Sequence, residues 1–381
     1  MTRLVFLVPG FFGFTTIGSV SYFHDVEHSL SRALGKRGID ARIVHCPTQP
    51  TGSIVRRADS LRRHVIENGG LKARELNFIG HSTGGLDVRM LLTPGVKIAP
   101  DDTEERIARR TRTAISVVTP HFGTPLANAF VTAQGHQLLL LLSSLATTSP
   151  ARAAIMASTR SLSLLSRMDD WFDRGNGPID RLSRALLRNI SFRRDDPTWK
   201  YLEAIASDQG AVLQLTPEAI DLFEASVTDR SGIDYGCVIA GVPKPREELR
   251  ARALLHPQRV ALRGLFRMLH GITANARKQY PYPVPPAATK RRLEKKLGFA
   301  LNQRTNDGVV PTLSQLHGRV VHVARADHLD VVGHFTLAAE NASDWLPSGA
   351  GFTPDGFEAL WDSVAAAIAG RAPKRRTRAA A

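Results

Sequence analysis

The chain has 381 residues, of which 43% are hydrophobic and 22% charged, and its formal net charge is +15. This length and composition exclude a disordered or fibrous protein and are typical of a soluble globular protein with a large core. The strongest apolar run, QLLLLLSSLA at 137–146, is about half of what a bilayer span requires, so no transmembrane segment is expected.

Apolar patterning predicts alternating strands and helices in the first third of the chain. Near-continuous apolar runs predict buried strands, and apolar residues at helical spacing predict amphipathic helices between them. The expected strands are 4–10, 40–47, 75–80 and 112–120, and the expected helices are 21–36, 53–70 and 84–92. This alternation indicates an α/β protein with a mostly parallel central sheet and helices on both faces.

The alternation resumes later, with strands expected at 234–241 and 318–324 and a final helix at about 354–369. Two stretches interrupt it, a Ser- and Arg-rich one at about 128–200 and a basic, Pro-rich one at 243–298. We interpret both stretches as insertions on the sheet.

One domain over residues 1–370 accounts for this pattern, with the insertion at 128–200 acting as a helical lid or cap. The leucine cluster at 138–142 would then line or cover an acyl-chain pocket, or it belongs to an ordinary buried helix. The basic tail at 371–381 has no apolar periodicity and is expected to be disordered.

The positive charge invites a nucleic-acid hypothesis, which its distribution weakens. Basic residues gather in the tail, in KRRLEKK at 290–296 and in 251–267, and the last two stretches are typical of solvated faces of amphipathic helices. No zinc finger, helix-turn-helix or RNA-binding aromatic motif accompanies them. The charge therefore supports attraction to an anionic surface such as lipid headgroups, and no specific nucleic acid.

The N-terminal run MTRLVFLVPGFFGF is broken by Pro9 and Gly10 and is followed by no small-residue cleavage site. It predicts a first buried strand rather than a signal peptide, and we expect a cytoplasmic protein. Cys46 and Cys237 each end a strand-like run. They could pair if the fold brought them together, but two buried free thiols in a reducing compartment fit better, and neither has zinc-ligand spacing.

The stretch FIGHSTGG at 78–85 places Ser82 directly after a predicted strand and before a predicted helix. The flanking Gly80 and Gly84 permit a strained turn that lifts the serine hydroxyl clear of a sheet. The alternative is a small residue in an ordinary tight turn. The strand–turn–helix placement favours a nucleophile, with the N–H of Thr83 facing the oxyanion.

A serine nucleophile needs a base to take its proton and a carboxylate to orient that base. TNDGVVP at 305–311 offers Asp307, and ARADHLDVVGHF at 324–335 offers His328. Alone, Asp307 could be a plain turn residue and His328 a surface histidine. Together they follow Ser82 in the order acid, histidine, on either side of one strand, and they favour a catalytic triad.

A second oxyanion donor should come from the loop after the first strand, PGFFG at 9–13. Proline has no N–H to donate, and Gly10 allows close backbone approach. We therefore expect the N–H of Phe11 to be this donor.

The chain resembles the bacterial triacylglycerol lipases of the α/β-hydrolase fold, the true-lipase family of Pseudomonas and Burkholderia type. The motifs that carry the resemblance occur in the family's order: LVPGFFGF, SVSYFHDVEHSLSRALGKRG, FIGHSTGGLDVR, VVTPHFGTPLA, QLTPEAIDLF, TNDGVV and DHLDVV. The resemblance implies hydrolysis of carboxylic esters through an acyl-serine intermediate, with a mobile lid over an apolar acyl pocket. It also places the family's acid on Asp307 and its base on His328.

The chain also departs from that family. The family's oxyanion loop begins with His-Gly where this one has Pro-Gly, and its members are secreted behind signal peptides. They hold a structural calcium by two aspartates, of which one matches Asp330 and the other falls at 281–290, which has no carboxylate here. Because calcium prefers several oxygen ligands, we expect this site to be lost or rebuilt and no cofactor to be required.

The leading hypothesis is a serine lipase or esterase that cleaves acyl esters. A thioesterase, an amidase or an acyltransferase would use the same triad, and the sequence does not separate them. A third hypothesis is a non-catalytic hydrolase homologue that binds lipid or nucleic acid through its basic helices and tail.

Overall fold

A computed structural model of the chain describes residues 2–11, 13, 16–17, 20–131, 205, 208–245, 257–275, 280, 282–335, 344 and 346–370. The predicted lid beyond residue 131, its leucine cluster and the basic tail lie outside these residues.

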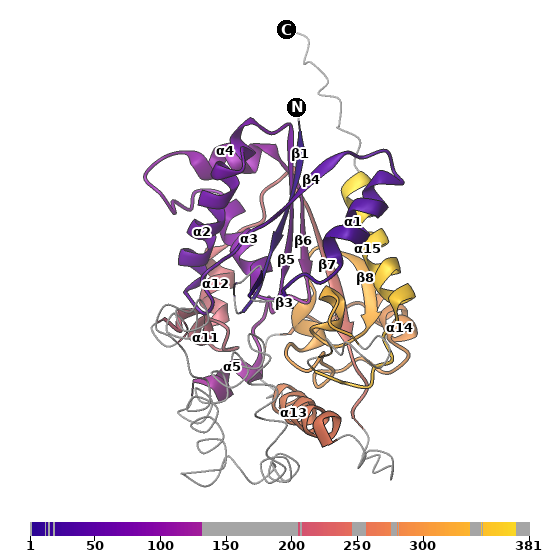
Figure 1. Ribbon diagram of the computed structural model, residues 1–381. Helices are drawn as coiled ribbons and strands as arrows, with labels where there is room; N and C mark the ends of the chain where they lie inside the picture. Colours follow the sequence, from indigo (N-terminus) through magenta and orange to yellow (C-terminus); the bar gives the residue numbers. More distant parts are fainter. Residues whose placement is uncertain are drawn as a thin grey trace, which may run out of the picture.

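Six parallel strands form the central sheet, in the order β4-β1-β5-β6-β7-β8 (Figure 1). The strands are β1 (Arg3–Val8), β4 (Ala41–His45), β5 (Glu75–His81), β6 (Thr111–Val117), β7 (Asp234–Gly241) and β8 (Arg319–Arg325). A two-stranded antiparallel pair, β2 (Thr16–Ile17) and β3 (Val20–Ser21), follows β1. The parallel sheet predicted from the apolar patterning is confirmed, with strand ends shifted by at most three residues.

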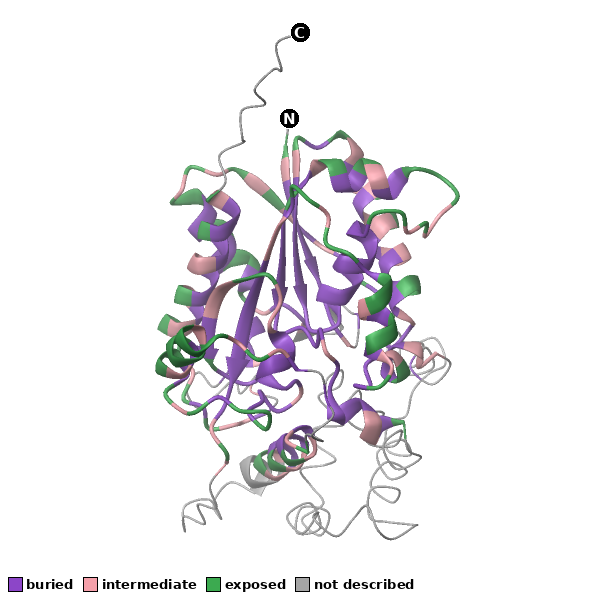
Figure 2. Ribbon diagram, turned by 180° about the vertical axis from the view of Figure 1, so that it is seen from behind, coloured by how far each residue is buried: buried purple, intermediate pink, exposed green. Residues whose placement is uncertain are grey.

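Strand β1 shows why the sheet is buried on both faces. Val5 and Leu7 belong to one hydrophobic cluster, and Leu4, Phe6 and Val8 belong to another on the opposite face. Successive side chains of a strand point to opposite faces, so a run without polar interruptions needs helices on both sides. Figure 2 accordingly shows buried strands between helices whose outer sides are exposed.

Helices α1 (Val26–Gly35) and α15 (Pro354–Ala369) pack together on one face of the sheet (Figure 1). The hydroxyl of Thr353 accepts the N–H of Gly356 and caps α15, and Pro354 occupies its first turn. Proline suits this position because the first N–H groups of a helix have no partner within it. The predicted C-terminal helix is confirmed.

Helices α2 (Ile54–Glu67), α3 (Gly84–Leu92) and α4 (Thr103–Arg110) cover the other face. The hydroxyl of Ser53 caps α2 by accepting the N–H of Arg56, and Gly69 follows its end at φ 79°. Helix α4 was not predicted. The short helix η1 (Gly70–Lys72) links α2 to β5.

The remaining described helices lie at or after the carboxyl ends of the strands or along the edge of the sheet. They are α5 (Pro125–Phe130), α11 (Gly210–Gln214), α12 (Ile220–Ser226), α13 (Pro257–Thr273), α14 (Ala287–Leu297), η4 (Thr312–Gln315) and η5 (Asp330–Val332). Helices α13 and α14 fall within the stretch interpreted as the second insertion. Among the helices that are described, none combines the length and the apolar composition needed to cross a bilayer.

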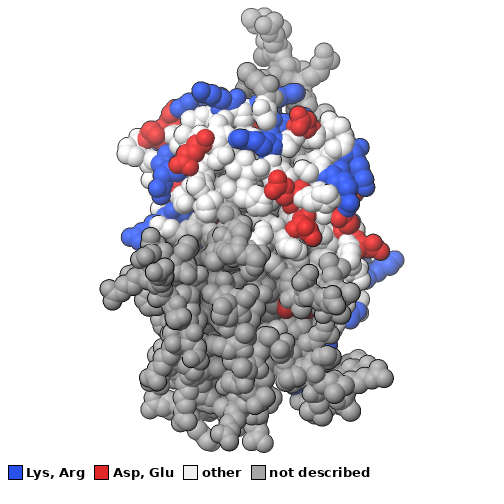
Figure 3. Space-filling model, viewed as in Figure 1, with Lys and Arg blue, Asp and Glu red and all other residues white. Residues whose placement is uncertain are grey.

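On the face seen in Figure 3, the described surface has no large patch made of basic or of acidic side chains alone. Lys and Arg side chains are interspersed there with Asp and Glu side chains. The potential over this described face is therefore not dominated by one sign of charge.

Candidate active site

Ser82 occupies the sharp turn between β5 and α3. Its backbone has φ 53°, in the left-handed region that residues with a side chain rarely adopt, and its N–H donates to the carbonyl of Val117 at 2.9 Å. Such strain costs on the order of 1–3 kcal/mol and is concentrated at functional sites. The turn has the strand–turn–helix geometry of a nucleophile elbow.

Glycines allow this turn to pack closely. A methyl group on Gly80 would lie 2.4 Å from the backbone nitrogen of Gly85, and one on Gly84 would lie 2.3 Å from the carbonyl oxygen of Val8. A methyl group on Gly10 would lie 2.4 Å from Cβ of Ser82. The loop after β1 therefore lies directly against the serine, where the sequence placed a second oxyanion donor.

Asp307 and His328 are in direct contact. Nδ1 of His328 donates to Oδ2 of Asp307 at 2.8 Å, and the N–H of His328 donates to the Asp307 carbonyl at 3.0 Å. Both side chains are buried, at 0% and 5% exposure. Because Nδ1 of His328 bonds Asp307, the other ring nitrogen, Nε2, is the one that can exchange a proton with a substrate or a nucleophile.

The Asp307 carboxylate is held on both oxygens. Oδ1 accepts the N–H groups of Val309 and Val310 at 2.9 and 2.7 Å, and the Gln315 amide donates to Oδ2 at 3.1 Å. Asp307 is therefore a turn residue and a partner of His328 at once. Gln315 was not singled out from the sequence, because nothing in its neighbourhood pairs it with an acid eight residues earlier.

A chain of hydrogen bonds joins the loop after β1 to His328. The Tyr22 hydroxyl accepts the N–H of Gly10 at 2.8 Å and lies 2.7 Å from Nδ1 of His81. Because the His328 carbonyl can only accept, Nε2 of His81 donates to it at 3.0 Å, and Nδ1 of the neutral ring then accepts from the Tyr22 hydroxyl. Burial holds the pKa of His81 well below its usual value, so this ring is neutral.

This chain of bonds also locates the serine relative to the histidine. The rings of His81 and His328 have centroids 4.8 Å apart, and Ser82 is the residue that follows His81. Asp307 and His328 are therefore in direct contact, whereas Ser82 is placed near them only through its neighbour His81, and no hydrogen bond joins the Ser82 hydroxyl to His328 in the described part of the chain. Ser82 and His328 each follow the carboxyl end of a strand, where parallel sheets place their sites.

A fully buried ion pair anchors the loop after β1. The Arg57 guanidinium binds both carboxylate oxygens of Asp87, with its shortest contact at 2.8 Å, and both side chains have 0% exposure. Arg57 also donates to the carbonyls of Pro9 and Gly10 at 2.8 and 3.1 Å. This pair, which sequence reasoning missed, fixes the backbone that faces Ser82.

The two expected oxyanion donors belong to two segments that meet at the serine, since Thr83 follows it in the chain and Phe11 follows Gly10, which packs against it. Thr83 precedes the first residue of α3, and its N–H has no acceptor within the described part of the chain. Phe11 directly follows Gly10, whose own N–H is used by Tyr22. Helix N-terminal N–H groups favour nearby negative charge, which suits the position of Thr83.

Asp330 is the residue that matches a calcium ligand in the resembling family. Its Oδ2 accepts the N–H of Asp327, while Oδ1 of Asp327 accepts the N–H groups of Leu329 and Asp330. These two carboxylates thus serve as turn acceptors, and within the described residues no group of three or more His, Cys, Asp or Glu is arranged to hold a metal ion. Oδ2 of Asp327 is buried and has no hydrogen-bond partner among the described residues, so this acidic turn keeps one oxygen that a proton or a cation could satisfy.

Cys46 and Cys237 are free and buried, which confirms the interpretation as unpaired thiols. Burial raises the pKa of the Cys237 thiol to about 11, so it stays protonated and unreactive.

Comparison with known proteins gives one partial sequence match and a broad structural likeness. No family model matches the chain. A triacylglycerol lipase from Vibrio cholerae is 34% identical over 86 residues, a match that spans 22% of this chain and 26% of that protein.

Two solved structures align with nearly the whole chain. The Staphylococcus hyicus lipase covers 97% of this chain and 95% of its own at 13% identity, with a TM-score of 0.52. EstA from Clostridium botulinum covers 95% of this chain and 88% of its own at 18% identity, with a TM-score of 0.50. At such identities the likeness concerns the fold: the chain has the α/β-hydrolase fold of bacterial lipases and esterases.

Proposed function

We propose that this protein is a serine hydrolase that cleaves carboxylic esters through an acyl-serine intermediate. The observation that carries the proposal is a serine in a strained strand-to-helix turn beside a buried, hydrogen-bonded Asp–His pair. The three residues occur in the chain order that this fold uses for its triads.

Each residue of the site has a distinct role in the proposed reaction. Ser82 attacks the ester carbonyl while Nε2 of His328 takes its proton and later returns it to the leaving alcohol. Asp307 holds the imidazole through Nδ1 and stabilises the positive charge that forms on it. Water then attacks the acyl-serine by the reverse sequence of proton transfers.

Backbone donors would stabilise the tetrahedral intermediate. Thr83 directly follows the serine and Phe11 follows Gly10, which packs against it, while Arg57 anchors the carbonyls of Pro9 and Gly10. Donors held before the reaction are effective because they need no reorganisation as charge develops. Loss of one such donor typically slows turnover on the order of a hundredfold or more.

An acyl ester is the substrate class that we infer. The Vibrio cholerae relative is a triacylglycerol lipase, and the Staphylococcus hyicus neighbour is a lipase. A thioester, an amide or a non-water acceptor would use the same three residues. Rates on acyl esters of graded length, with matched thioesters and amides and with added alcohols, separate these reactions.

Labelling with a fluorophosphonate probe tests the proposal. The wild type should label stoichiometrically, and Ser82→Ala should lose both labelling and esterase activity. Ser29→Ala is the matched control, since Ser29 is a buried serine of α1 whose hydroxyl donates a hydrogen bond to Glu358 of α15. An unlabelled wild type, or labelling that survives in Ser82→Ala, would overturn the assignment.

We further infer that the protein is attracted to anionic surfaces through α14. This helix exposes five basic residues, Lys290, Arg291, Arg292, Lys295 and Lys296. A lipid headgroup layer suits such a face, because each nearby basic residue contributes about 1 kcal/mol. Co-sedimentation with vesicles of phosphatidylglycerol, against vesicles of phosphatidylcholine and against duplex DNA, tests this inference.

A further inference from the structure

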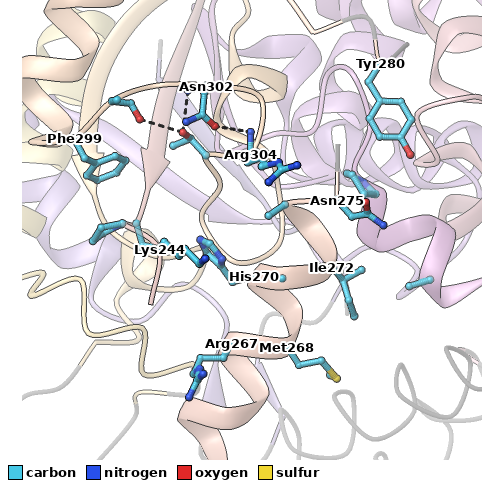
Figure 4. A pocket seen from close by; sticks show the side chains of 18 of the residues that line it. Lys244, Arg267, Met268, His270, Ile272, Asn275, Tyr280, Phe299, Asn302 and Arg304 are labelled. Atoms are coloured by element: carbon cyan, nitrogen blue, oxygen red, sulfur yellow. Dashed lines mark hydrogen bonds between the residues drawn. The ribbon is translucent and has the colours of Figure 1, made fainter. Parts of the chain in front are cut away.

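A cavity lies at the carboxyl end of β7, and Ser82 is not among its described lining residues. Its volume is about 960 Å³, and its walls come from α5, the residues after β7, helix α13 and the loop 299–305 (Figure 4). Neither Ser82 nor His328 is among the described residues that line it. The volume is that of a cavity for a ligand of drug-like size.

The cavity has basic side chains and no acidic ones. Lys244, Arg267 and Arg304 line it, and no Asp or Glu is among the described lining residues. Lys244 and Arg304 form no ion pair with any residue that the structure describes. Like charges around a concave wall raise the local positive potential and attract anions.

His270 adds a buried polar group to the same wall. The residue is only 7% exposed, and its Nε2 has no hydrogen-bond partner in the described part of the chain. Figure 4 shows His270 next to Lys244. Besides its burial, the Asp307 carboxylate and then Lys244 act on the His270 ring electrostatically, in opposite directions. A buried ring nitrogen without a partner is unusual in a folded protein, and a bound polar group would satisfy it.

The rest of the wall is largely apolar. The described side chains that provide it include Val242, Met268, Ile272 and Phe299. A ligand that matches both parts needs a negatively charged head and a hydrocarbon chain. We propose that this cavity binds an anionic amphiphile, a fatty carboxylate or an alkyl phosphate, with its head at Lys244, Arg304 and His270 and its chain along the apolar wall.

The position of the cavity separates this binding from the chemistry at Ser82. Helix α13 forms one wall and contacts the Asp307 loop from its other side, where the Asn306 amide donates to the His270 carbonyl at 3.3 Å. The Thr273 hydroxyl donates to the Gly308 carbonyl at 3.2 Å. A bound amphiphile would therefore lie behind the acid loop, and binding should survive the loss of the serine.

Calorimetric titration of the full-length Ser82→Ala protein tests the proposal, with each ligand below its critical micelle concentration. Dodecyl phosphate and dodecanoate should each bind at one site. The double variant Lys244→Gln/Arg304→Gln should weaken both affinities by about tenfold or more, because charge-assisted hydrogen bonds to the head are lost. Dodecanol should bind at least about tenfold more weakly than dodecyl phosphate for the same reason.

Two further arms make the test specific. Shortening the chain should weaken binding by up to about fourfold per methylene, and inorganic phosphate alone should bind far more weakly. The control variant Lys36→Gln/Lys97→Gln removes the same charge from exposed positions outside both the cavity and α14 and should leave the affinity unchanged. Equal affinity of the Lys244→Gln/Arg304→Gln protein, of dodecanol or of inorganic phosphate would overturn the proposal. Because the serine is absent throughout, none of these outcomes bears on ester hydrolysis.

Discussion

The two sides of the candidate active site bury their carboxylates in opposite ways. On the β5 side, Asp87 has 0% exposure and is enclosed by the guanidinium of Arg57. On the β8 side, Asp327 and Asp330 are 1% and 4% exposed, and neither forms an ion pair with a described residue. A buried carboxylate therefore lies beside a cation on the β5 side and beside a second carboxylate on the β8 side.

This difference assigns different physical roles to the two sides. The Arg57–Asp87 pair uses its spare donors to hold the backbone of Pro9 and Gly10, so it acts as an anchor for the oxyanion loop. Burial and then the Asp344 carboxylate raise the pKa of Asp327 to about 7, and burial and Asp327 raise that of Asp330 well above its usual value. Burial also raises the pKa of Asp87, but only to about 6 because Arg57 opposes the rise, so the β8 side, which has no such cation, holds the higher carboxyl pKa values.

Removing Arg57, the cation beside Asp87, should have the largest effect of the changes considered. Arg57→Met would leave the Asp87 carboxylate buried and unpaired, and we expect a loss of about 3–5 kcal/mol in the free energy of unfolding. Urea denaturation measures it. Esterase activity should fall as well, because the carbonyls of Pro9 and Gly10 lose their donor.

The control for this substitution lies on the same helix. Arg62 pairs with Asp59 at 2.9 Å near the surface, and Arg62→Met should cost less than about 1 kcal/mol. The double variant Arg57→Met/Asp87→Leu should regain much of the lost stability without regaining activity, since no charge is left unpaired but the loop stays unanchored. Equal losses for Arg57→Met and Arg62→Met would contradict the role of the buried pair.

Neutralising Asp327 on the β8 side should stabilise the protein at alkaline pH. With the pKa of Asp327 at about 7, the folded state keeps a proton that the unfolded state loses near pH 4, so stability falls as pH rises from about 4 to 7. Asp327→Asn removes this titration. We expect similar stabilities of variant and wild type near pH 4–5 and a gain of about 1–3 kcal/mol for the variant at pH 8.

Urea denaturation across this pH range measures the gain, and Asp59→Asn, at a partly exposed carboxylate, should show none. The measurement should be repeated with calcium and with a chelator. A wild type that is stabilised by calcium at pH 8 while Asp327→Asn is not would show that a cation, rather than a proton, neutralises the pair.

The bond chain between the two sides should have a smaller effect. Tyr22→Phe removes the hydroxyl that joins Gly10 to His81, and we expect a loss of about 1–2 kcal/mol in stability. Because His81 holds the His328 carbonyl, kcat should also fall by about three- to tenfold with little change in KM.

Tyr282→Phe is the matched control for Tyr22→Phe. The Tyr282 hydroxyl is buried and has no hydrogen-bond partner among the described residues, so its removal should cost nothing. Steady-state kinetics with a soluble ester and urea denaturation provide both measurements. A Tyr22→Phe protein with wild-type kcat would show that the two sides act independently.

Much of this architecture is readable from local patterns. Strands such as β1 and β7 are compact apolar runs, and Ser82, Asp307 and His328 each lie in a short motif, of which the first and last follow a strand. Helix boundaries were less readable. The predicted helix from residue 21 begins at Val26, because Tyr22 and Phe23 instead enter the core from a loop.

The parts that could not be predicted depend on long-range contacts. Helix α4 escaped notice because Ile107 and Ala108 are its only buried apolar residues, which gives too weak a periodicity. The Arg57–Asp87 pair joins residues 30 apart, and Tyr22 lies 59 residues from His81. No local sequence pattern identifies such partners, because each of these residue types also occurs on solvent-exposed surfaces.

The smallest expected effect concerns the residue that follows the serine. The Thr83 hydroxyl is buried at 1% residue exposure and has no partner within the described chain. Thr83→Val keeps the shape and the backbone N–H while removing this unsatisfied group, so we expect a gain of about 1 kcal/mol in stability. Activity should stay within about twofold of wild type, because the proposed oxyanion donor is the N–H. A loss of about a hundredfold would instead identify the hydroxyl as the donor. The β5 side of the site would then stabilise the oxyanion with the rotatable Thr83 hydroxyl rather than with a fixed backbone N–H.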